Sequence, residues 1–139
     1  MKPEMKIGEL ARRTACRVET IRFYEKKGML PPPPRSTGNY RLYGKMHVER
    51  LLFIRRCRSL DMTLDEIRRL LQIRDTPQDD CSAVSAFLDG HIRQIGVRIA
   101  ELQQLRNQLD SLRQLCSGAQ TVAQCGILQE LDSSGFASD

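Results

Sequence analysis

The chain has 139 residues, of which 5 % are aromatic and none is tryptophan, and its formal net charge is +5. This composition argues against a compact β-sandwich, and the length allows one domain with a core or a small domain with an extended element. No apolar stretch approaches the length that spans a bilayer, and the first residues, MKPEMKIGELARR, lack the apolar run of a signal peptide. We therefore expect a cytoplasmic protein without a membrane partner.

The charge is divided unevenly along the chain. Residues 1–74 contain 18 Lys and Arg against 8 Asp and Glu, a net charge of +10, whereas residues 75–139 contain 4 against 9, a net charge of −5. A basic segment without low-complexity repeats indicates binding to nucleic acid or to another anionic surface. The acidic half is expected to serve a different purpose.

Two short helices are predicted near the N-terminus. Ile7, Leu10 and Ala11 have helical spacing, and after a break at residues 15–17 the segment VETIRFYEKKG carries apolar residues as far as Gly28, a candidate C-terminal cap. Two short helices across a three-residue turn are typical of a helix-turn-helix motif.

A small β-hairpin is predicted after these helices. Four consecutive prolines exclude a helix, and the segment RSTGNYRLY that follows offers a turn at Gly38 and Asn39. An alternating strand is expected to end at Tyr43. The segment is therefore predicted to form a wing beside the helices.

A second helix pair is predicted after the wing. The segment KMHVERLLFIRRCRSL is helical in its periodicity, and its expected core face consists of Val48, Leu51, Leu52, Ile54 and Leu60. Thr63 and Glu66 have the spacing of a capping box, which predicts another short helix through Leu71. Cys16 and Cys57 lie in or beside these helical faces, and we expect both to be small buried residues.

One long helix is predicted from about Asp80 onward. Asp79 or Asp80 can cap its N-terminus, and apolar residues recur at intervals of 4, 3, 4, 3, 3, 4 and 3. These apolar positions are Leu88, Ile92, Ile95, Ile99, Leu102, Leu105, Leu109 and Leu112. The pattern is typical of a coiled-coil seam, which predicts a homodimer because a single helix leaves the stripe exposed. The alternative is that the helix packs on the basic half of its own chain.

Three of the five cysteines lie at the two ends of this helix. Cys81 stands at its beginning, and Cys116 and Cys125 bound the loop CSGAQTVAQC at its end. Cys81 and Cys116 are roughly 50 Å apart at the helical rise of ~1.5 Å per residue, so one chain cannot bring all three thiols to one ion. In an antiparallel dimer, Cys81 of one subunit can meet Cys116 and Cys125 of the other.

Three thiolates form a soft ligand set. The loop offers no histidine or carboxylate as the fourth ligand that a structural zinc usually requires. His47 and His91 lie elsewhere in the chain, and we expect each to be structural or solvated. The set therefore favours Pb(II) or Hg(II), or Cd(II) with an added oxygen ligand.

Over nearly its whole length the chain resembles the MerR family of transcription regulators. The resemblance rests on three segments in the family order, IGELARRTACRVETIRFYEKKGML, RSTGNYRLY and HVERLLFIRRCRSLDMTLDEIRRLL, followed by a long helix and a cysteine loop. Cys81 together with CSGAQTVAQC resembles the Cd(II)/Pb(II)-responsive branch, particularly the lead-responsive regulators, and mercury regulators have a similar spacing. Zinc sensors of the family tend to have an extra cysteine and a histidine around the loop, which this sequence lacks. Iron–sulfur members have four closely grouped cysteines, which it also lacks.

The resemblance implies a mostly α fold with three parts. These are a winged helix-turn-helix DNA-binding domain at 1–74, an antiparallel coiled-coil dimerisation helix at 75–115, and a metal-binding loop with a short helix and tail at 116–139. It also implies DNA contacts by Arg17, Arg22, Tyr24, Arg35, Tyr40 and Arg41, the first three in the recognition helix and the others in the wing.

The resemblance also implies a mechanism. Family members bind promoter DNA as homodimers with or without metal, and metal binding makes them bend and untwist the DNA so that RNA polymerase engages both promoter elements. The expected function is activation of metal-resistance genes, with Pb(II) as effector and Cd(II) or Hg(II) as alternatives.

Other functions are compatible with parts of the sequence. A metal-sequestering or metal-transfer protein would need no operator-specific DNA binding. A thiol redox sensor would join Cys116 and Cys125 in a disulfide, but neither a CxxC motif nor flanking basic residues are present to lower a thiol pKa. An enzyme is the least expected class, because no cluster of acids, histidines or phosphate-cradling glycines appears.

Overall fold

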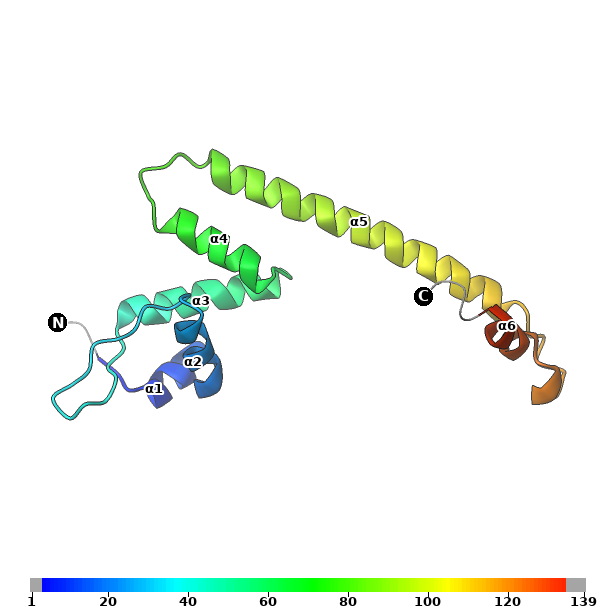
Figure 1. Cartoon of the computed structure of the whole chain (residues 1–139), viewed down its shortest axis with the longest axis horizontal. Coiled ribbons are helices and arrows are strands. Elements are labelled where there is room, and N and C mark those ends of the chain that lie inside the picture. Colours follow the sequence, from blue (N-terminus) through cyan, green and yellow to red (C-terminus); the bar gives the residue numbers. More distant parts are fainter. Residues whose placement is uncertain (1–3, 135–139) are drawn as a thin grey trace. The chain divides into compact units, whose positions relative to one another are not determined.

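The structure is a computed structural model that describes residues 4–134. Within this range the chain forms six α-helices and one short 3-10 turn (Figure 1). It divides into two compact units, Met1–Phe87 and Leu88–Asp139. The helices are α1 (Ile7–Thr14), α2 (Val18–Lys26), α3 (Lys45–Ser59), α4 (Leu64–Arg74), α5 (Ser82–Arg113) and α6 (Gly126–Ser134), with the 3-10 turn η1 at Val122–Gln124. The predicted mostly α class is confirmed.

The predicted helix-turn-helix is formed by α1 and α2, and α1 packs on both α2 and α3. The break between them begins at Ala15, whose φ of 55° is left-handed. At the end of α2, Gly28 has a φ of 75°, and the N–H of Met29 donates to the carbonyl of Tyr24 at 2.9 Å. This arrangement is the one by which a glycine ends a helix, so the predicted cap at Gly28 is confirmed.

The core of the first unit is apolar and runs through α1 to α4. Its centre includes Leu10, Ile21, Leu51, Ile54 and Ile67, each of which is 0 % exposed. Cys57 is buried as predicted, whereas Cys16 is only half-buried.

Two predicted core positions on α3 are wrong. Leu52 is 43 % and Leu60 50 % exposed. Leu52 follows the fully buried Leu51, and neighbouring residues of an α-helix point about 100° apart, so both cannot face the same core. Leu60 is the C-terminal cap residue of α3 and lies beyond its last turn.

The wing is a loop closed by single β-bridges, so the prediction of an alternating strand is wrong. Within residues 4–134 the structure contains isolated bridges between Arg35 and Arg41 and between Met5 and Tyr43, but no extended strand. The four prolines that lead into the wing lack an N–H group, which limits the ladder that this side can form. The predicted turn is present, since Asn39 has a φ of 64° and its N–H donates to the carbonyl of Ser36 at 2.9 Å.

The predicted capping box begins α4. The N–H of Glu66 donates to Oγ1 of Thr63 at 3.1 Å, and the N–H of Thr63 donates to Oε1 of Glu66 at 2.8 Å. The prediction of a capped helix start is therefore confirmed. The helix ends at Arg74, three residues beyond the predicted end at Leu71.

The long helix α5 runs unbroken for 32 residues. Before it, Asp80 accepts the N–H of Ser82 at 2.9 Å, as predicted for a capping aspartate. The predicted seam is exposed in the single chain, with Ile92 63 % and Leu109 57 % exposed. None of the described helices is both long and apolar enough to cross a membrane.

Candidate nucleic-acid interface and metal centre

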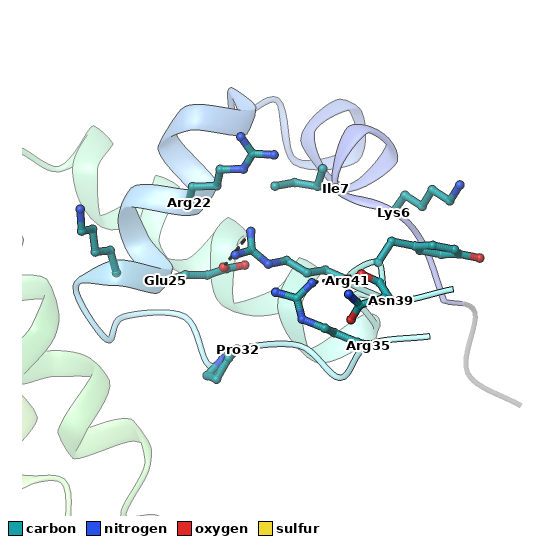
Figure 2. Close-up of a pocket in the computed structure, with 10 residues that line it drawn as sticks. Lys6, Ile7, Arg22, Glu25, Pro32, Arg35, Asn39 and Arg41 are labelled. Atoms are coloured by element: carbon teal, nitrogen blue, oxygen red, sulfur yellow. Dashed lines mark hydrogen bonds and ion pairs between the residues drawn. The ribbon is translucent and has the colours of Figure 1, made fainter. Parts of the chain in front are cut away.

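A basic groove of about 890 Å³ lies between α2 and the wing (Figure 2). Arg22 on α2 and Arg35 and Arg41 of the wing line this groove from its two sides. Tyr40 lines it as well, with Nζ of Lys6 placed 4.3 Å from the centre of its ring. The structure therefore brings four of the six predicted DNA-contacting residues to one basic surface.

Glu25 on α2 connects the wing to this helix. The hydroxyl of Tyr43 donates to Oε2 of Glu25 at 2.5 Å, and Nη1 of Arg41 lies 3.6 Å from Oε1. Burial, followed by the hydrogen bond and the charge of Glu25, raises the pKa of Tyr43 to about 12. Arg41 is still 36 % exposed, so its guanidinium is accessible to an incoming phosphate.

The other two predicted contacts, Arg17 and Tyr24, lie at a second pocket of about 380 Å³. Arg17 precedes α2 and is exposed, whereas Tyr24 is 8 % exposed and burial raises its pKa. Tyr24 therefore packs in the core and also lines this pocket. Arg55 and Arg58 of α3 line the same pocket and were not predicted, although their spacing of three residues puts them on one helix face.

The structure brings Cys116 and Cys125 together in the second unit. Cys125 immediately precedes α6, and its pKa is lowered chiefly by the backbone N–H of Leu128, with smaller contributions from the N–H of Ile127 and a hydrogen bond from Cys116. A thiol pKa in this loop is therefore lowered by backbone N–H groups, although the sequence has neither the CxxC motif nor the flanking basic residues that would lower it. These N–H groups belong to the first turn of α6, which lies in the segment 116–139 where a short helix was expected.

The loop is closed by a tight backbone contact. A Cβ added to Gly126 would lie only 2.6 Å from the carbonyl oxygen of Leu115 and 3.2 Å from its Cβ. Nη1 of Arg113 donates to the carbonyl of Cys116 at 3.1 Å. Gly118 has a φ of 84°, a left-handed conformation that glycine adopts without strain. The two thiols thus lie on a loop whose ends touch.

Cys81, the third predicted ligand, belongs to the first unit. It is exposed, immediately precedes α5, and lines an apolar pocket of about 350 Å³ together with Phe53, Ile73 and Val84. The whole of α5 lies between it and Cys116 in the chain. A group of three or more histidines, cysteines or acids that could hold a metal ion is not found within the described part of a single chain.

Both histidines of the chain are buried. Nδ1 of His47 accepts the N–H of Gly44 at 3.0 Å, and its Nε2 lies 3.2 Å from the carbonyl of Pro31. Burial lowers the pKa of His47, so the neutral ring joins the start of α3 to the proline run. His47 is structural, in agreement with the prediction, and His91 is buried as well.

Two family models match this chain. A model described as MerR HTH family regulatory protein matches residues 5–73, and one described as MerR, DNA binding matches residues 48–112. A transcription regulator of Ralstonia metallidurans, solved in complex with lead(II), has 53 % sequence identity and a TM-score of 0.85, and the match covers 91 % of this chain and 98 % of that one. The MerR regulator of Bacillus megaterium, solved in complex with mercury(II), has 31 % identity and a TM-score of 0.73 over 92 % of this chain and 99 % of that one.

Curated relatives give the same family. A homologue of the transcriptional regulator ZntR from Haemophilus influenzae is 46 % identical over 79 % of this chain and 82 % of its own length. The mercuric resistance operon regulatory protein of Bacillus cereus is 34 % identical over 92 % of this chain and 97 % of its own length. The chain belongs to the MerR family of helix-turn-helix transcription regulators, and the family resemblance seen in the sequence is confirmed.

Proposed function

We propose that this chain is a cytoplasmic, homodimeric activator of metal-resistance genes, with Pb(II) as effector and Cd(II) or Hg(II) as alternatives. The observation that carries the proposal is the paired thiols of Cys116 and Cys125 at the start of α6, in a chain that has a MerR-type DNA-binding domain. A metal-sequestering protein would have no use for that domain.

The exposed seam of α5 supports a dimer. Leu102, Leu105 and Leu109 are each about half exposed in the single chain, and burial of such a stripe is what drives two helices to associate. An antiparallel pairing would place Cys81 of one subunit beside Cys116 and Cys125 of the other, because the cysteines flank opposite ends of the helix. The relative solved with lead(II) supports this proposal, because its match extends over 91 % of this chain.

The three cysteines suit a soft ion. Cys125 is already shifted toward the thiolate, the form that binds metal, and Cys81 is exposed and available to a second subunit. Cys81, Cys116 and Cys125 would hold the ion through sulfur, which favours soft and borderline metals. A bound ion would supply positive charge and a fixed link between the two subunits.

The DNA-binding residues would act on the duplex backbone. Arg22, Arg35 and Arg41 can each neutralise a phosphate in the basic groove, and Tyr40 can donate to one. Because Glu25 connects the wing to α2, both elements would engage the duplex as one surface. Metal binding would favour the dimer geometry that bends and untwists the promoter, after which RNA polymerase engages both promoter elements.

A competitive titration tests the metal assignment. Reduced, metal-free protein is titrated with Pb(II), Cd(II), Hg(II) and Zn(II) while the thiolate-to-metal absorbance is recorded. We expect Pb(II) to displace Zn(II) and to saturate at one ion per set of three thiols. Equal competition by Zn(II) would overturn the assignment of the effector, and a Hg(II) response without a Pb(II) response would favour the mercury regulators.

The wing assignment can be tested with Arg41→Ala. This substitution removes one guanidinium from the groove, so we expect weaker binding to every duplex and a decrease of about 0.9 in the slope of log affinity against log salt. The measurement is a salt series of DNA-binding isotherms. Arg106→Ala on α5 removes the same charge outside the groove and should keep the wild-type slope. An unchanged slope in Arg41→Ala would mean that this arginine does not contact a phosphate.

A further inference from the structure

A bidentate ion pair joins α3 to the end of α4 within the first unit. Nη1 and Nη2 of Arg50 donate to the two carboxylate oxygens of Asp75 at 3.0 and 3.2 Å. Nε of the same guanidinium donates to the carbonyl of Met29 at 2.6 Å. The Arg50 side chain is only 14 % exposed, whereas that of Asp75 is 54 % exposed. One planar group is therefore held between two segments that are far apart in the sequence.

The first of these segments is the end of the recognition helix. The N–H of Met29 donates to the carbonyl of Tyr24 at 2.9 Å, just after the glycine that ends α2. The backbone of Met29 is thus tied to α2 through its N–H and to Arg50 through its carbonyl. A shift of the guanidinium would therefore be transmitted to the last turn of α2.

The second segment leads directly to Cys81. Asp75 is the C-terminal cap residue of α4, and its N–H donates to the carbonyl of Leu71 at 2.9 Å. In the short linker that follows, the N–H of Asp79 donates to the carbonyl of Thr76 at 3.1 Å. Because this linker is short and contains a turn, a displacement of Cys81 can be passed along the backbone to Asp75.

We infer that Arg50 and Asp75 are positioning residues that couple metal capture at Cys81 to the orientation of the recognition helix. This inference rests on the proposed function and extends it to a pair that touches neither metal nor DNA in the groove described above. The planar fork of arginine fixes both the distance and the angle to the carboxylate, which a lysine would not do. The pair can therefore pass on a change of linker geometry, as coupling between two sites requires.

The test separates coupling from binding. Asp75→Asn keeps the size of the side chain and one oxygen acceptor but removes its charge. The probe is a duplex selected from a random-sequence library by the wild-type protein, with a fluorescent dye at each end to report bending. We expect Asp75→Asn to keep metal-free DNA affinity and the Pb(II) affinity of the free protein. The ratio of bent to unbent duplex that Pb(II) produces, read from energy transfer, should fall by about fivefold or more, the lower end of typical allosteric couplings.

A matched control and a second variant keep the test decisive. Asp65 lies 3.9 Å from Arg68 in an exposed pair on α4, so Asp65→Asn makes the same charge change and should keep the full response. Arg50→Lys keeps the charge, loses the fork, and should be uncoupled like Asp75→Asn.

Three outcomes would contradict either the inference or the proposed function. A full Pb(II) response in Asp75→Asn, with a responding wild type, would overturn the coupling and leave the proposed function standing. An equal loss of metal-free DNA affinity and metal response would mean that the pair only stabilises the fold, which also overturns the inference. A wild type that binds the selected duplex but shows no metal response would instead overturn the proposed function.

Discussion

Cys81→Ser is expected to abolish the metal response while leaving operator binding nearly intact. Cys81 is exposed and immediately precedes α5, so serine in its place disturbs no core contact. In the proposed dimer, however, the Cys81 thiolate is the one ligand that a subunit adds to the Cys116 and Cys125 thiolates of the other subunit. Loss of a direct ligand should reduce Pb(II) affinity by more than the roughly 10- to 100-fold that loss of an outer-shell partner causes.

The measurement combines a Pb(II) titration with DNA binding in the absence of metal. Cys16→Ser is the matched control, because it makes the same change at a half-buried thiol of the first unit and outside the proposed ligand set. It should bind Pb(II) like the wild type. If Cys81→Ser bound Pb(II) with unchanged affinity, the intersubunit ligand set would be wrong, and an equal loss of DNA binding would make Cys81 a structural residue.

Local signals in the sequence predicted most of the helical framework. Gly28 ended α2 and the Thr63 capping box began α4, because each depends on hydrogen bonds between residues a few positions apart. The wing strand and the burial of Leu52 were predicted wrongly. Both depend on partners elsewhere in the chain. The wing strand would need a second strand, which the prolines do not provide, and Leu52 would need to lie on the one side of α3 that faces the core.

The predictions for the metal site were likewise successful only in part. The spacing of Cys81, Cys116 and Cys125 along one predicted helix was sufficient to propose a shared thiolate set, and the structure brings the last two together. The lowered pKa of Cys125 was not predictable from neighbouring charges, because its cause is the backbone of a helix that begins one residue later. The close approach of residue 126 to residue 115 has no sequence signal beyond the glycine itself.

That glycine gives the second large expected effect. In Gly126→Ala, the new Cβ would lie 2.6 Å from the Leu115 carbonyl oxygen, a backbone atom that cannot rotate away as a side chain could. Because Leu115 precedes Cys116, relief of the clash should move Cys116 away from Cys125. Mutation of the outer-shell groups that orient metal ligands typically costs about 10- to 100-fold in affinity, and we expect a loss of similar size for Pb(II).

Gly90→Ala on α5 is the matched control, since a Cβ at Gly90 meets no atom within 4 Å. Alanine there should stabilise the helix by about 0.5–1 kcal/mol and leave Pb(II) affinity unchanged. Titration of both variants, with metal-free DNA binding measured alongside, separates a local effect on the loop from a general effect on the fold. Wild-type Pb(II) affinity in Gly126→Ala would show that the loop can open at this contact without separating the thiols, and that the metal holds them together without help from the backbone.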